Sequence, residues 1–135
     1  MRFPIRTIAA FASVLAAGAA MAAEMTGAEM KALIAGNTVY VETTAASATG
    51  TVGKGAIYYA LDGSSLYKTP KGEIWHGAWT IKDNLLCTEW KETPKGPCLK
   101  YDKQGDVINV NNSETGVTRV KIMKTAAGNA ENLKP

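Results

Sequence analysis

Few side chains in this 135-residue chain could take part in acid–base or nucleophilic chemistry. His76 is the only histidine, so any acid–base proposal must consider it. The serines nearest to it in the sequence, Ser64 and Ser65, lie in no nucleophile motif, and a catalytic triad needs its members held together in space. We therefore predict no catalytic residue, and a small hydrolase using His76 is the last of three functional hypotheses.

Cys87 and Cys98 are the only cysteines, and they predict a structural disulfide. Redox-active pairs usually follow a Cys-X-X-Cys pattern, whereas these two lie much farther apart. A metal site would need further ligands, but the aspartates fall at predicted turns, where they favour backbone hydrogen bonds. The disulfide would close a loop of about twelve residues and contribute roughly 3 kcal/mol. The sequence predicts neither a metal site nor a bound cofactor.

The aromatic side chains are the candidates for ligand binding. In an alternating strand, Trp75, Gly77 and Trp79 share one face. If that face points into a barrel, Trp75 and Trp79 line a pocket for a small apolar molecule together with Trp90 and Tyr59. The alternative is that the same side chains pack as an ordinary hydrophobic core.

Residues 87–98 predict a disulfide-clamped hairpin with an exposed tip. The tip carries Thr-Pro-Lys-Gly at 93–96, a tetrapeptide that also occurs at 69–72 and suits a tight turn. A rigid tip loses little entropy on binding, so the second hypothesis is an envelope interaction protein or inhibitor. The residues assigned to this surface are Glu89, Trp90 and Lys95.

Residues 1–23 have the order of a secretory signal peptide. A short basic start precedes an uncharged, mostly apolar run at 8–20, and the small residues that follow allow cleavage after Ala22 or Ala23. The run is too short to predict a stable membrane anchor. We therefore expect an exported protein, periplasmic or secreted, in a compartment where a disulfide forms.

The charge of the chain does not favour a nucleic-acid partner. The chain has 15 basic and 12 acidic residues, and removal of residues 1–23 takes away two arginines and no acid. The lysines of the remaining domain are dispersed, whereas nucleic-acid binding requires a concentrated basic patch. A small molecule or an envelope protein is the partner that we expect.

The sequence after the signal predicts one helix followed by strands. Thr26 and Glu29 have the spacing of a capping box and Gly36 is a typical helix stop, which together predict a helix over 25–36. Segments rich in β-branched and aromatic residues follow, separated by turn signals. They lie at 37–44, 56–61, 65–68, 73–81, 85–91, 98–101, 107–110 and 117–123.

These elements predict a single, mainly β domain over 24–124. We expect an antiparallel meander of about seven or eight strands, closed as a small lipocalin-like barrel or folded as a sandwich. The short N-terminal helix would pack on the sheet or plug one end of the barrel. Residues 125–135 are predicted to form a flexible C-terminal tail.

The order of short motifs along the chain carries a resemblance to a known group. These motifs are Leu33-Ile34-Ala35-Gly36-Asn37-Thr38, Tyr58-Tyr59, Asp62-Gly63, Gly77-Ala78-Trp79, Cys87 with Trp90, Cys98, and Gly128-Asn129. In this order they resemble small exported alphaproteobacterial proteins grouped as a domain of unknown function, although residues 45–53 depart from that group. The resemblance implies a bacterial periplasmic or secreted protein with a β-rich fold, and it implies no activity.

The first functional hypothesis is therefore a non-enzymatic binding module of the periplasm or the secreted fraction. It would take a small apolar molecule, or a partner protein, through the mouth of the barrel. The interaction hairpin and the His76 hydrolase are the two alternatives.

Overall fold

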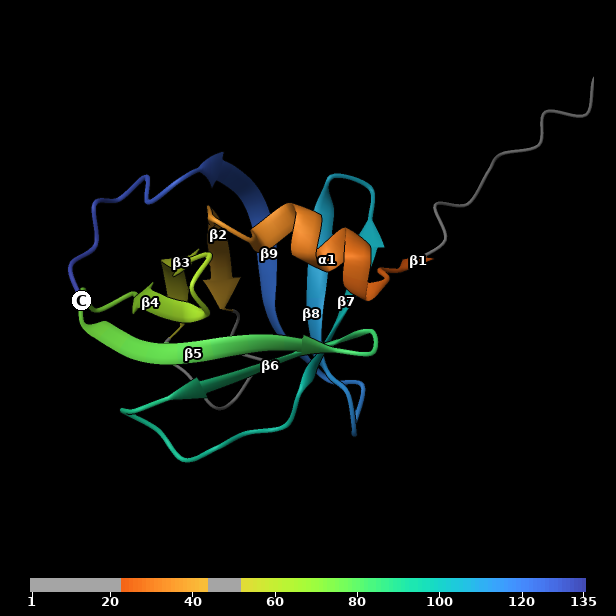
Figure 1. Ribbon diagram of the computed structural model, residues 1–135. Coiled ribbons are helices and arrows are strands. Elements are labelled where there is room, and N and C mark those ends of the chain that lie inside the picture. The colour runs from red at the N-terminus through yellow and green to blue at the C-terminus, as the bar shows by residue number, and fades with distance from the viewer. Residues whose placement is uncertain (1–22, 44–51) are drawn as a thin grey trace, which may run out of the picture.

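Strands make up most of the domain (Figure 1). The computed structural model describes residues 23–43 and 52–135, so the predicted signal peptide lies outside the described residues apart from Ala23. The described residues form nine strands and one helix. In chain order these are β1 (Ala23–Glu24), α1 (Gly27–Ile34), β2 (Asn37–Thr43), β3 (Gly53–Tyr59), β4 (Ser64–Lys68), β5 (Ile74–Lys82), β6 (Leu85–Trp90), β7 (Leu99–Gln104), β8 (Val107–Asn112) and β9 (Thr118–Ala127).

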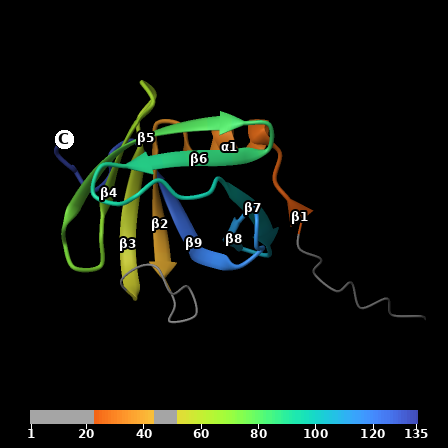
Figure 2. The ribbon, with the colours of Figure 1, turned by 90° about the horizontal axis from the view of Figure 1, so that it is seen from below.

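Strands β2 to β9 close into an antiparallel barrel (Figures 1 and 2). Each of them pairs with the next strand along the chain, and β9 pairs back with β2. Strand β1 is additional and lies beside β7. The predicted meander is therefore confirmed, and it closes as a barrel rather than a sandwich. All the predicted strands are present, with shifts of a few residues at their ends.

Helix α1 closes one end of the barrel. The capping box is formed: the Thr26 hydroxyl accepts a hydrogen bond from Glu29 N at 3.2 Å, and the Glu29 carboxylate accepts one from Thr26 N at 3.3 Å. Met30 and Ile34 are fully buried against side chains of the barrel core. The Asn84 side chain, in the turn before β6, accepts a hydrogen bond from the first turn of the helix. No helix in the described part of the chain is long and apolar enough to cross a membrane.

The opposite end of the barrel carries the longer connections. Because consecutive strands run up and down, the segments that lead into β5, β7 and β9 all lie at this end. Two of these connections, 69–73 and 91–98, contain the two Thr-Pro-Lys-Gly copies. The repeated tetrapeptide, which the sequence presents as two unconnected turns, therefore occurs twice at the same end of the barrel.

The seam between β6 and β7 is the weakest part of the barrel wall. These strands pair only at Leu86 and Leu99, and the Cys87–Cys98 disulfide lies next to that pair with a Cα–Cα distance of 4.3 Å. The predicted disulfide is confirmed. The predicted hairpin stem is reduced to one residue pair, and most of the connection 91–98 runs without ladder hydrogen bonds. The disulfide therefore replaces the ladder that is missing at this seam.

The alternation predicted for β5 is confirmed. Trp79 is buried in the core and Trp75 and Ile81 pack toward the interior, while Ala78 is exposed. Gly77 lies between the two tryptophans for a steric reason: a Cβ there would clash with the backbone oxygen of Glu89 and lie 2.7 Å from the Trp90 ring of β6. The glycine therefore makes room for Trp90 on the inner face.

Residues 125–135 are not the flexible tail that the sequence predicted. Strand β9 continues to Ala127, and the next residues pack on the outside of the barrel. The Thr38 hydroxyl donates to Gly128 O at 2.7 Å and accepts from Ala130 N at 3.0 Å. Leu133 is only 6% exposed. The prediction failed because the contact that holds this segment is the buried hydroxyl of Thr38, which lies far away in the sequence. The segment itself has no apolar pattern that would indicate the contact.

Candidate functional site

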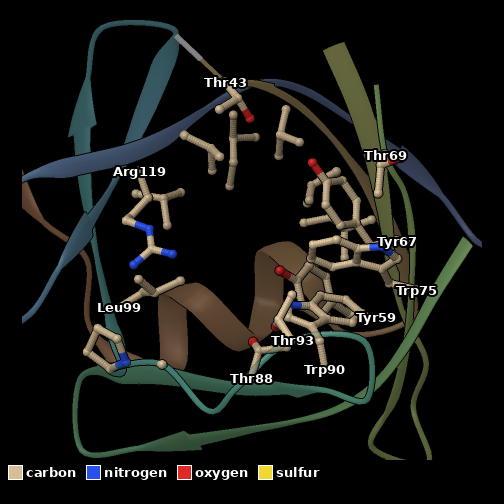
Figure 3. Close-up of a pocket in the computed structure, with 18 of the residues that line it drawn as sticks. Thr43, Tyr59, Tyr67, Thr69, Trp75, Thr88, Trp90, Thr93, Leu99 and Arg119 are labelled. Carbon is tan, nitrogen blue, oxygen red and sulfur yellow. The ribbon is translucent and has the colours of Figure 1, made fainter. Parts of the chain in front are cut away.

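A cavity of about 470 Å³ lies inside the barrel, at the end opposite to α1 (Figure 3). Its apolar walls come from β2, β3, β8 and β9, and its aromatic wall from β3 to β6. Pro94 and Gly96 of the connection 91–98 line the cavity and are also exposed, so the cavity reaches the surface beside them. Ligand pockets usually measure about 300–1,000 Å³, so this space suits one small molecule.

Three of the four residues predicted to bind a ligand line this cavity. Tyr59, Trp75 and Trp90 lie on one side of it, together with Tyr67 (Figure 3). The Tyr67 ring lies between the tryptophans, with its centroid 5.6 Å from that of Trp75 and 5.8 Å from that of Trp90. Such clustered rings give a large, rigid apolar surface for a ligand.

Trp79 does not line the cavity and is a correction to the prediction. Its side chain lies deeper, packed edge-to-face on Tyr59 at 5.8 Å between centroids, and its indole N–H donates to Ala60 O at 2.9 Å. Trp79 shares the face of Trp75, but it lies four residues farther along β5, toward α1. It therefore fills the core below the cavity.

Tyr59 and Tyr101 line the base of the cavity. Burial raises the pKa of Tyr59 to about 12. Burial also raises the pKa of Tyr101 well above its ordinary value. Both hydroxyls therefore remain protonated at neutral pH. They offer hydrogen bonds to a ligand but do not act as bases.

Among the described residues, Arg119 is the one charged side chain that lines the cavity, and it was not predicted from the sequence. The pairing of β8 with β9 shifts so that Val120 opposes Val110 but Thr118 opposes Asn111. Arg119 is the extra residue of this bulge, and its guanidinium points into the cavity from the side opposite to the aromatic wall (Figure 3). Bulges redirect side chains in this way, and strict alternation along β9 does not reveal one.

The two Thr-Pro-Lys-Gly connections form part of the cavity rim. Thr69 and Pro70 of the first copy and Thr93 and Pro94 of the second all line the cavity. Each Thr-Pro pair turns toward the interior, and the lysine that follows it is exposed. The repeated tetrapeptide therefore has the same structural role at both places.

The three residues predicted to form the interaction surface do not all lie on the same face of the barrel wall. Glu89 and Lys95 are exposed and form an ion pair at 2.9 Å, a contact that contributes little to stability at such exposure. Trp90 instead lies on the inner face and lines the cavity. The predicted set therefore does not form one outward-facing patch, because neighbouring strand residues point to opposite faces.

Among the described residues, no hydroxyl or thiol side chain is hydrogen-bonded to His76. Its Nδ1 lies 2.8 Å from the Glu92 carboxylate. Desolvation acts to raise the pKa of Glu92, but hydrogen bonds from His76 outweigh it and lower this pKa below its ordinary value. Ser65 pairs with Gly77, and Leu66 pairs with His76, so Ser65 and His76 face opposite sides of the sheet. Ser65 Oγ is buried without a hydrogen-bond partner in the described structure.

Comparisons with family models, with curated proteins and with solved structures find no match for this chain. The resemblance to exported alphaproteobacterial proteins therefore stays a prediction. In the described part of the chain, no three acidic, histidine or cysteine side chains converge as metal ligands would. The site has to be interpreted from its own geometry, which is that of an aromatic, largely apolar cavity with one cation.

Proposed function

We propose that this protein is a non-enzymatic binding module that holds one small, mainly apolar molecule inside the barrel. The observation that carries the proposal is the cavity of about 470 Å³, which the aromatic side chains line but do not fill. Core packing normally leaves few voids larger than a water molecule. A space of this size, bounded by Tyr67, Trp75 and Trp90, favours ligand binding over plain core packing.

The construction of the barrel supports the same function. Helix α1 fills one end with Met30 and Ile34, both fully buried, so the cavity has a closed floor. The disulfide fixes the connection 91–98, whose residues form part of the wall. A site that is already formed loses less entropy on binding.

We also propose that the protein acts outside the cytoplasm, as a periplasmic or secreted protein. The support is the signal-like order of residues 1–23 together with the Cys87–Cys98 disulfide, which is typical of an oxidising compartment. Cleavage after Ala22 would preserve both residues of β1, whereas cleavage after Ala23 would remove one of them. We therefore favour Ala23 as the first residue of the mature protein.

The test is the binding of a neutral fluorescent probe, N-phenylnaphthylamine, to the mature protein. Thr88 lines the cavity from β6, so Thr88→Phe should fill the space and weaken probe binding by about tenfold or more. Thr80→Phe is the matched control, because Thr80 is exposed on β5 and pairs with Cys87 on the outer face. Should Thr88→Phe fail to fold, Thr93→Phe blocks the cavity from the connection 91–98.

Two results would contradict the proposal. One is that the folded wild-type protein gives no enhancement of probe fluorescence. The other is that Thr80→Phe weakens binding as much as Thr88→Phe does, since the probe would then sit on the outside. Circular dichroism of each variant shows that the barrel is intact.

A further inference from the structure

We propose that the ligand carries a single acidic group, a carboxylate, which pairs with Arg119 while its apolar body lies against the aromatic wall. This inference rests on the proposed binding function and specifies the chemical class of the ligand. It starts from one side chain whose charge has no protein partner.

The guanidinium of Arg119 has no ion-pair partner in the described part of the chain. All twelve carboxylate side chains of the protein lie within residues 23–43 and 52–135. None of them comes within 4.0 Å of the Arg119 nitrogens, since the ion pairs of this part of the chain involve other residues. Arg119 also donates no hydrogen bond to the described protein groups. An arginine side chain keeps its positive charge and presents five N–H donors, so this site lacks an acceptor.

Among the described residues that line the cavity, no other side chain is charged at neutral pH. Apart from Arg119, the lining residues are apolar or aromatic side chains, threonines, prolines and one glycine. A half-buried cation among apolar groups is costly unless an anion joins it. One cation with no second charged side chain among the described lining residues favours a group with one negative charge, and a planar carboxylate matches the guanidinium by two parallel hydrogen bonds.

The placement of Arg119 also says how such a ligand would lie. Strand β9 is on the side of the barrel opposite to β5, because three strands separate them in either direction around the closed sheet. Figure 3 shows the guanidinium on one side of the cavity and Tyr67, Trp75 and Trp90 on the other. An acidic group at Arg119 therefore directs the apolar body of the molecule across the cavity onto the aromatic rings.

The experiment compares two molecules with the same apolar body, decanoate and methyl decanoate, as competitors of N-phenylnaphthylamine. With the wild-type protein, decanoate should displace the probe at a concentration about tenfold lower than methyl decanoate does. Arg119→Gln should abolish this preference by weakening decanoate alone. Arg119→Lys should restore part of it. Lys121→Gln, the same charge change on the exposed side of β9, should leave the preference unchanged.

The outcomes separate this inference from the proposed function. Equal displacement by the acid and the ester in the wild-type protein would overturn the acidic ligand but leave an apolar binding site, and this comparison needs no variant. Stronger displacement by decyl phosphate than by decanoate would overturn the assignment of a carboxylate. Failure of the neutral probe to bind at all would instead refute the cavity itself. Because that probe is uncharged, its own affinity should be the same in Arg119→Gln.

Discussion

Removal of the disulfide should destabilise the barrel and weaken ligand binding together. The seam between β6 and β7 has one ladder pair, Leu86 with Leu99, so little else holds the connection 91–98 in place. The cysteines are separated by 11 positions, and closing a loop of about twelve residues stabilises the native state by roughly 3 kcal/mol. For a domain of this size, that loss lowers the melting temperature by about 10–20 °C.

The assay uses the double variant Cys87→Ala/Cys98→Ala beside the wild-type protein with and without dithiothreitol. Thermal and urea unfolding, followed by circular dichroism, give the change in the free energy of unfolding. The reduced wild-type protein is the matched control, because it loses the bond without changing the side chains. Since Thr93 and Pro94 line the cavity, both forms should also bind N-phenylnaphthylamine more weakly. An unchanged melting temperature and unchanged probe affinity would refute the claim that the disulfide holds the β6–β7 seam together.

Two further predictions concern the outer segment and the base of the cavity. Thr38→Val keeps the shape of a fully buried side chain but removes its hydrogen bonds to Gly128 and Ala130. This change should lower the free energy of unfolding by about 1–3 kcal/mol and speed amide hydrogen exchange in 128–133. Unchanged exchange would contradict the packing of this segment on the barrel. The folded-state pKa of Tyr59, about 12, lies above the unfolded value of about 10. The contribution of this group to stability is therefore complete below pH 10 and is lost as the pH rises toward 12. Tyr59→Phe should reduce the fall in the free energy of urea unfolding between pH 10 and 12, and an identical pH profile would contradict the shifted pKa.

The sequence predicted the fold well because the fold depends on local signals. The turn residues between the strands mark the ends of the meander, and the Thr26–Glu29 capping box marks the start of α1. The two cysteines had no other plausible chemistry, and they form the disulfide. Each of these signals is complete within a few residues, so no knowledge of the rest of the chain was required.

The candidate site was predicted only in part, for a geometric reason. Alternation along a strand says which face a side chain occupies, but it does not say how far along the barrel axis the side chain lies. Trp75 and Trp79 therefore looked equivalent, although only Trp75 borders the cavity. Arg119 was missed because the bulge in β9 breaks the alternation, and because a lone arginine near a predicted turn has the pattern of an ordinary surface residue.

Nuclear Overhauser contacts to bound decanoate are the most direct test of whether a ligand lies inside the barrel. We expect contacts from the alkyl chain to the methyl groups of Val41, Ile57 and Val120, which line the cavity. We expect none to Leu61, which is 81% exposed on the outside. Contacts to Leu61 with none to the three interior residues would show that apolar molecules bind only the surface, and would contradict binding inside the barrel.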